Sequence, residues 1–200
     1  MKTMMYIHGY GSTGQATKAQ LLQAMFPDAR LVSPTFDYNT LRPQEVYNQL
    51  QEIVANEKPD LILGSSMGGY YALCTTAFYH GTVWCVNPVR DILATIRRLM
   101  TENLPDAPEL KSIATARQQG QALLAQLLSE YEVFDRDLFQ QLKPLDGQLH
   151  FALSTDDELL GDHHPLLDRF PNYGSVVWKD HCGHRFFRFD ELKEAITKSL

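Results

Sequence analysis

Residues 60–72 read Asp-Leu-Ile-Leu-Gly-Ser-Ser-Met-Gly-Gly-Tyr-Tyr-Ala. The apolar start is typical of a short buried strand, and the end is typical of a helix that begins near Met67. Between them lies a Gly-x-Ser-x-Gly pattern with Ser66 at its centre. A serine on a strained strand-to-helix turn needs small residues two positions before and after it, and Gly64 and Gly68 meet that need. The pattern predicts a nucleophilic serine at Ser66.

Short strand patterns alternate with helical patterns on both sides of this motif, which predicts an α/β fold with a mostly parallel sheet and helices on both faces. We expect strands at residues 3–7, 30–33, 60–63, 82–86, 149–154 and 175–178. We expect helices at residues 17–25, 43–56, 67–77 and 190–199. The chain has neither internal repeats nor a linker, so residues 1–200 are interpreted as a single domain.

The alternation is lost between residues 90 and 142, which are rich in Gln, Leu and Ala. Two or three helices are expected there, the clearest over residues 109–130. We interpret residues 90–142 as a helical cap inserted over one end of the sheet.

The composition excludes several classes of protein. A hydrophobic content of 44% and a charged content of 21% exclude wholesale disorder. The net charge is −6 and no basic stripe is visible, so a nucleic-acid partner is not expected. No apolar run is long enough for a membrane span, and the N-terminus reaches His8-Gly9 before a signal-peptide core could form. The chain has three cysteines without CxxC spacing, which favours reduced thiols and a cytoplasmic location.

A serine nucleophile needs an acid and a base, which follow it along the chain in the order carboxylate, then histidine. Asp156, Asp157 and Glu158 directly follow the strand expected at residues 149–154. We favour Asp157 as the acid. At least two of the three carboxylates are expected to lie in a solvated turn.

Two histidines, His181 and His184, follow the last expected strand. We favour His184 as the base, because Gly183 gives the loop room to turn the imidazole inward. Asp180 and His181 are an alternative local pair.

The oxyanion of an acyl-transfer reaction needs backbone N–H donors. One is expected from Met67, the residue after the nucleophile, and the other from Tyr10, in the loop after the first strand. His8 is expected to be a structural residue that holds this loop.

Two alternative sites are weaker. Gly9-x-Gly11-x-x-Gly14 matches a dinucleotide fingerprint, but no acidic residue closes the second strand as a ribose partner would. Asp162, His163 and His164 contain metal-ligand side chains, but no second cluster has ligand spacing, so a solvated loop is expected. We therefore expect neither a metal nor a cofactor.

Several motifs, in order along almost the whole chain, resemble those of one family. They are Tyr6-Ile-His-Gly-Tyr10, Gly64-Ser-Ser-Met-Gly-Gly-Tyr-Tyr-Ala72, Asn87-Pro88, Thr155-Asp-Asp-Glu158 and Gly183-His-Arg-Phe186. Together they resemble the YqiA-like esterases, small bacterial members of the α/β-hydrolase superfamily. The family usually has Leu at the position of Met67 and Gly at the position of Asp156.

The resemblance implies an α/β-hydrolase fold with Ser66 as nucleophile, Asp157 as acid and His184 as base. It also implies hydrolysis of a carboxyl ester or thioester of a small acyl substrate in the cytoplasm, without a cofactor. Three alternatives stay open: a peptidase or acyltransferase with the same triad, a non-catalytic protein of this fold that binds a small ligand, and a dinucleotide-binding oxidoreductase.

Overall fold

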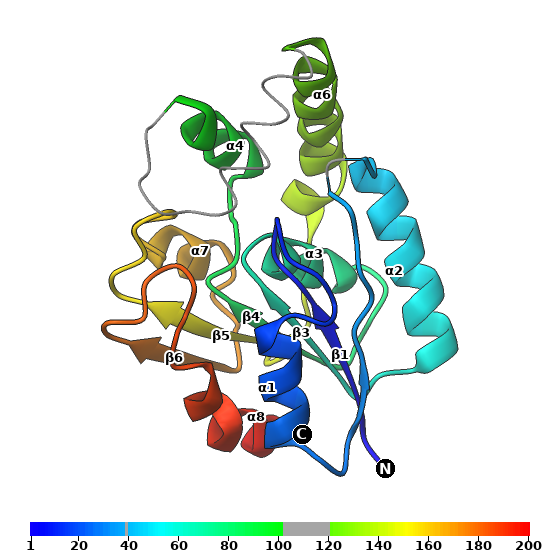
Figure 1. Cartoon of the computed structure of the whole chain (residues 1–200), viewed down its shortest axis with the longest axis vertical. Helices are drawn as coiled ribbons and strands as arrows, with labels where there is room; N and C mark the ends of the chain where they lie inside the picture. Colours follow the sequence, from blue (N-terminus) through cyan, green and yellow to red (C-terminus); the bar gives the residue numbers. More distant parts are fainter. Residues whose placement is uncertain (39, 102–120) are drawn as a thin grey trace.

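The computed structural model describes residues 1–38, 40–101 and 121–200. Its centre is a six-stranded sheet in the order β2-β1-β3-β4-β5-β6, and every neighbouring pair is parallel (Figure 1). The strands are β1 (Thr3–Ile7), β2 (Arg30–Val32), β3 (Leu61–Ser65), β4 (Thr82–Val86), β5 (Leu149–Ser154) and β6 (Ser175–Lys179). The predicted parallel α/β sheet is confirmed, with strand ends that differ from expectation by at most two residues.

Helices follow most strands, as the alternating pattern predicts. They are α1 (Thr17–Met25), α2 (Pro43–Glu57), α3 (Met67–Thr75), α4 (Ile92–Thr101), α6 (Gln121–Asp137), α7 (His164–Arg169) and α8 (Lys193–Ser199), with 3₁₀ turns η1 (Phe139–Gln141) and η2 (Phe189–Leu192). Helix α2 begins at a proline, and the Glu45 carboxylate accepts a hydrogen bond from the Arg42 N–H at its start (2.8 Å).

Three helices differ from the sequence-based expectations. The helix expected at residues 190–199 begins as the 3₁₀ turn η2 and becomes α-helical at Lys193. The short helix α7 was not predicted, because six residues are too few to display a helical period. The helix expected at residues 109–130 is described from Gln121 and continues to Asp137, while residues 109–120 lie outside the described residues.

Apolar side chains cover both faces of the sheet. Along β1, Met5 and Ile7 pack into the core under α2, α3 and α6, whereas Met4 and Tyr6 pack on the opposite face with α1, η2 and α8. Successive side chains of a strand point to opposite faces, so a strand covered on both sides is apolar throughout.

The strand order places a switch point between β1 and β3. The chain leaves β1 toward α1 on one face and leaves β3 toward α3 on the other. The loops after these two strands therefore separate at the carboxyl edge of the sheet, where ligand sites of open α/β sheets form. The Gly-x-Ser-x-Gly motif and the His8-Gly9 loop both lie at this edge.

Helices α4 and α6 and the turn η1 lie in the range interpreted as a cap. Figure 1 shows α4 and α6 on the side of the molecule toward which β1 points. Helix α6 contacts α2 and α4, and η1 follows it directly. The interpretation of residues 90–142 as a cap stays a prediction.

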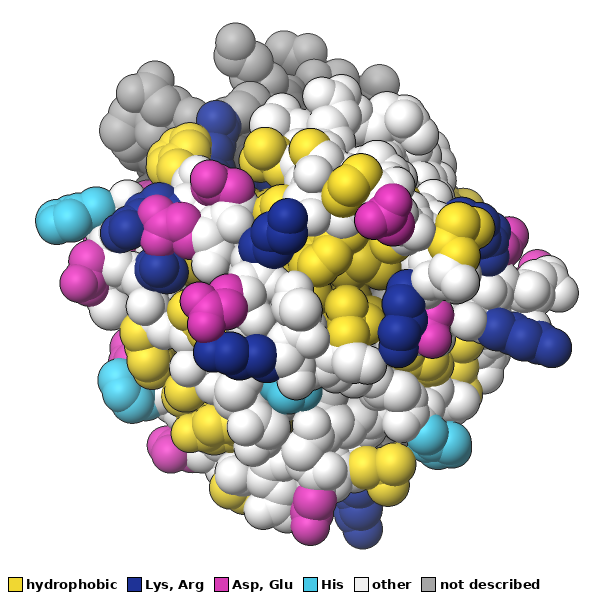
Figure 2. Space-filling model, turned by 90° about the horizontal axis from the view of Figure 1, so that it is seen from below, with side chains coloured by type: hydrophobic (Ala, Val, Ile, Leu, Met, Phe, Trp, Pro, Cys, Tyr) yellow, Lys and Arg dark blue, Asp and Glu magenta, His cyan; other side chains and the backbone are white. Residues whose placement is uncertain are grey.

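On the face shown in Figure 2, Lys and Arg side chains are interspersed with Asp and Glu side chains, so no basic stripe runs across it. No described helix combines the length and the apolar character that a membrane span requires.

Candidate active site

Ser66 occupies a strained turn between β3 and α3. Its φ of 56° and ψ of −120° lie in a region that residues with a side chain rarely adopt. A Cβ at Gly64 would overlap the carbonyl oxygen of Gly68 and lie 2.8 Å from Cβ of Ala72, and a Cβ at Gly68 would overlap the carbonyl oxygen of Ile7. The predicted strand–turn–helix geometry, with small residues on both sides of Ser66, is confirmed.

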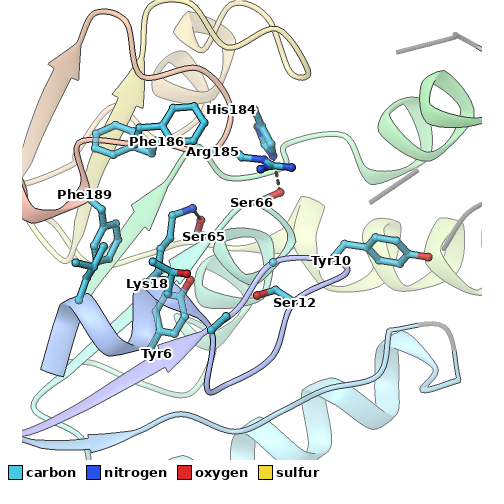
Figure 3. A pocket seen from close by; sticks show the side chains of 15 residues that line it. Tyr6, Tyr10, Ser12, Lys18, Ser65, Ser66, His184, Arg185, Phe186 and Phe189 are labelled. Carbon is cyan, nitrogen blue, oxygen red and sulfur yellow. Dashed lines mark hydrogen bonds between the residues drawn. The ribbon is translucent and has the colours of Figure 1, made fainter. Parts of the chain in front are cut away.

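The structure brings the side chains of Ser66, His184 and Asp157 into one hydrogen-bonded row. Oγ of Ser66 lies 2.8 Å from Nε2 of His184, and Nδ1 of His184 lies 3.0 Å from Oδ2 of Asp157 (Figure 3 shows the first contact). A carboxylate accepts, so Nδ1 carries the imidazole proton and Nε2 accepts from the serine hydroxyl. The serine and the histidine are 118 positions apart in the chain.

The other two carboxylates of the acidic turn hold the histidine loop. Asp156 and Glu158 are exposed, as a solvated turn requires, but both also accept backbone hydrogen bonds. Oδ1 of Asp156 accepts from the N–H of Gly183 (3.1 Å), and Oε2 of Glu158 accepts from the N–H of His184 (2.8 Å). Two of the three carboxylates are thus exposed, as expected, and all three also contact the histidine loop.

His163 is a partner of Asp157 that sequence reasoning missed. Its Nε2 lies 3.1 Å from Oδ2 of Asp157, and its side chain is 2% exposed. The solvated loop expected at this position is found for His164, which is exposed and pairs with Asp162 (2.6 Å), but not for His163. In the part of the chain that the structure describes, no group of three or more potential ligands is placed to hold a metal ion.

The environment of Asp157 favours its ionised form. Burial raises the pKa of this carboxyl, but hydrogen bonds from His163 and His184 and the backbone N–H of Leu160 outweigh that effect and hold the pKa well below its usual range. Asp157 is thus an anion that is already hydrogen-bonded to the imidazole of His184.

Asn87, at the end of β4, ties three segments together and was given no role by the sequence reasoning. Its Nδ2 donates to the carbonyl oxygens of Gly183 and His184 (both 3.0 Å), and its Oδ1 accepts from the N–H of Ser154 (2.8 Å). The residue is fully buried with a φ of 40°, a conformation that asparagine tolerates better than most residues. The Asn87-Pro88 pair after a strand was the available signal.

His8 has the structural role expected of it. Its Nε2 accepts from the N–H of Phe36 (2.9 Å), so its proton lies on Nδ1 and is donated to the carbonyl oxygen of Gly9 (2.8 Å). Burial lowers the pKa of His8, which keeps the ring neutral. A Cβ on Gly9 would lie 3.2 Å from Cβ of Ser66, so the loop that carries Tyr10 packs directly against the serine.

A pocket of about 340 Å³ opens over Ser66 and His184 (Figure 3). Gly9 and Tyr10 line it from the loop after β1. Met67 is the first residue of α3, so its N–H has no acceptor within the helix. The structure therefore places both expected oxyanion donors in the two segments that flank Ser66.

The three cysteines, Cys74, Cys85 and Cys182, are free and buried. Burial raises the pKa of each thiol, which disfavours the thiolate that a cysteine nucleophile would need.

Two UPF0227 proteins are similar to this chain over most of its length. One from Vibrio vulnificus (strain CMCP6) is 24% identical over 202 residues, covering 94% of this chain and 93% of the relative. One from Pectobacterium atrosepticum is 25% identical over 195 residues, covering 92% and 90%.

Solved structures with a similar fold share far less sequence. A monoacylglycerol lipase from Paleococcus ferrophilus has a TM-score of 0.64 at 14% identity, covering 98% of this chain and 92% of that one. The esterase domain of a Rhodothermus marinus protein has a TM-score of 0.64 at 15% identity, covering 98% and 85%. Mouse alpha/beta hydrolase domain-containing protein 10 has a TM-score of 0.64 at 13% identity, covering 98% and 88%. At these identities the likeness shows the fold, which is that of the α/β hydrolases.

The model of the Uncharacterised protein family (UPF0227) matches residues 3–199, nearly the whole chain. The resemblance to the YqiA-like group that the motifs indicated is confirmed at the level of the family. The chain belongs to the UPF0227 family and has the α/β-hydrolase fold.

Proposed function

We propose that this protein is a serine hydrolase that cleaves a carboxyl ester or thioester of a small acyl substrate through an acyl-enzyme on Ser66. The observation that carries the proposal is the hydrogen-bonded row from Oγ of Ser66 through the His184 imidazole to Asp157. A nucleophilic hydroxyl, a base and an orienting carboxylate in this order are what acyl transfer requires.

In the proposed reaction, Nε2 of His184 takes the proton of Ser66 while Oγ attacks the carbonyl carbon. The same imidazole then protonates the leaving alcohol or thiol as its bond to the acyl carbon breaks. Water, activated by His184, attacks the acyl-enzyme and releases the acid and free Ser66. Asp157 holds the imidazole tautomer and stabilises the charged ring that forms at each stage.

The negative charge of the tetrahedral intermediate needs two donors, and the backbone N–H groups of Met67 and Tyr10 are proposed for them. Each such donor lowers the barrier by about 3 kcal/mol. The packing of the Gly9 loop against Ser66 and the position of Met67 at the start of α3 support this assignment. The fold is also that of proteins named as a lipase and an esterase.

Replacement of Ser66 tests the proposal. Ser66→Ala should lower the kcat for 4-nitrophenyl butyrate by a factor of about 10⁴ to 10⁶. A fluorophosphonate probe should label the wild-type protein on the peptide that contains Ser66. Ser129→Ala, at an exposed position of α6, is the matched control and should change neither result.

Two outcomes separate the proposed hydrolase from its rivals. A wild-type protein that neither reacts with the probe nor cleaves esters would be a ligand-binding member of this fold. Transfer of the acyl group to an added alcohol or amine, in preference to water, would identify an acyltransferase instead.

Residues 90–142 are proposed to act as a cap that selects the acyl chain. A series of nitrophenyl esters and acyl-CoA thioesters of increasing chain length tests this role. We expect a clear optimum of kcat/KM at one length, whereas equal values at all lengths would contradict selection by the cap.

A further inference from the structure

Two cationic side chains line the pocket over Ser66, although the protein as a whole is acidic. Lys18, from α1, and Arg185, from the loop after β6, both line it together with Ser66 (Figure 3). None of the described residues that line the pocket is Asp or Glu, whereas the whole chain has 24 acidic and 18 basic residues. Two cations, and no Asp or Glu among the described lining residues, favour a negatively charged ligand.

The amino group of Lys18 is held close to the proposed nucleophile. Its Nζ donates a hydrogen bond to Oγ of Ser65 (2.9 Å), and Ser65 is the direct neighbour of Ser66. The Ser65 hydroxyl also hydrogen-bonds the buried hydroxyl of Tyr6. Lys18 is half-buried, so its charge is screened less than a surface charge would be.

The position of Lys18 is electrostatically unfavourable for its own helix. It is the second residue of α1, and the positive end of the helix dipole repels a cation in the first turn. The first turn of α1 contains no acidic residue that would offset this repulsion. A residue that opposes the local helix preference next to a functional site often has a role in that site.

Apolar surface continues from the charged part of the pocket. Phe187 lines it with 71% of its surface exposed, and Leu21 of α1 lines it as well. A ligand that fits both parts has a short apolar stem and an anionic end.

We propose that this pocket binds a carboxylate group of the substrate, with Lys18 and Arg185 as its partners. This inference rests on the proposed function and names the substrate class, an ester or thioester that carries a second, free carboxylate. The ammonium of Lys18 and the guanidinium of Arg185 bind the carboxylate by charge-assisted hydrogen bonds, while the ester carbonyl faces Ser66.

Three chromogenic esters test the proposal. 4-Nitrophenyl butyrate is neutral, mono-4-nitrophenyl glutarate carries a carboxylate on the acyl side, and 3-carboxy-4-nitrophenyl butyrate carries one on the leaving group. For each anionic ester, kcat/KM is divided by the value for the neutral ester in the same protein. The intrinsic reactivity of each ester is the same for wild type and variant, so it cancels when the two ratios are compared.

Lys18→Met and Arg185→Met should each lower the ratio by about tenfold for one of the two anionic esters, the effect of losing one charge-assisted hydrogen bond. Lys18→Arg keeps the charge and should restore most of the ratio. Lys143→Met, which removes one exposed charge elsewhere, is the matched control and should leave the ratio unchanged. In the wild type, the ratio should fall as salt is added.

Ratios within twofold of wild type for both anionic esters, in both methionine variants, would overturn the carboxylate site. That result is distinct from failure of the proposed function, in which no ester is cleaved and the probe does not label Ser66. If the ratio falls for the glutarate ester, the acyl half of the substrate enters the pocket. If it falls for the 3-carboxy-4-nitrophenyl ester, the leaving group does.

Discussion

Asn87 holds the backbone of His184: its Nδ2 lies 3.0 Å from the carbonyl oxygen of that histidine. The same amide group also binds Gly183, and its oxygen binds the N–H of Ser154 at the end of β5. One buried side chain directly after β4 thus links the segment that carries the proposed base to the strand that leads to Asp157. We interpret Asn87 as a positioning residue, since its side chain binds backbone groups and does not line the pocket.

Asn87→Ala should lower both stability and activity. The substitution removes three hydrogen bonds and leaves the Ser154 N–H and the His184 carbonyl oxygen without a partner, so we expect the free energy of unfolding to fall by about 3 kcal/mol. Displacement of the His184 ring should lower kcat by about 10- to 100-fold in the folded protein. Urea unfolding and ester kinetics at a temperature where the variant is folded measure the two effects.

The exposed Asn48 on α2 provides the matched control, and Asn48→Ala should have little effect on either quantity. A variant at position 87 with wild-type kcat would show that the backbone of the histidine loop needs no such support.

Asp157→Asn should destabilise the protein in a pH-dependent manner. The folded-state pKa of Asp157 is depressed, while in the unfolded chain it is about 3.9. Its stabilising effect is therefore complete above the unfolded value and is lost as the pH falls toward the folded one. We expect a loss of about 2 kcal/mol at pH 7 and a smaller loss at pH 3, measured by urea unfolding at both pH values.

Asp28→Asn, at an exposed carboxyl outside the site, serves as the reference and should behave like the wild type at both pH values. Equal losses for Asp157→Asn at pH 7 and pH 3 would be inconsistent with a depressed pKa in the folded protein.

Gly64→Ala and Gly9→Ala should separate folding from activity. The methyl group at position 64 would overlap the carbonyl oxygen of Gly68, so we expect a loss of several kcal/mol (about 3 or more) or failure to fold. The methyl group at position 9 would lie 3.2 Å from Cβ and 3.8 Å from Oγ of Ser66, which should lower kcat more than stability. Thermal unfolding and ester kinetics of both variants distinguish the two effects, and a Gly64→Ala protein with the wild-type Tm would contradict the steric argument.

Local sequence patterns were sufficient to predict most of the sheet and the turn at Ser66. The predicted ends of β1, β4, β5 and α1 agree with the observed ones, because strand and helix periods depend on neighbouring residues. The small residues around Ser66 are likewise a local steric requirement. Asp157 and His184 could be predicted from the sequence as candidates, because parallel strands end at the same edge and the loops that follow different strands meet there.

The roles of His163 and Asn87 could not be predicted from the sequence in this way. Next to Asp162 and His164, His163 looks like part of a polar loop, and only the folded chain buries it against Asp157. Asn87 has all three partners between 67 and 97 positions away in the sequence. Contacts of that kind depend on how loops pack at the sheet edge, which no local period encodes.

The order of residues was enough to specify which chemical groups this protein has, and along which strands and turns they lie. Folding brought the three carboxylates to one histidine loop, placed Asn87 behind that loop, and put Lys18 and Arg185 along one pocket. The physical reason is that hydrogen bonds and desolvation depend on distances of a few ångströms between groups that the chain separates by many residues.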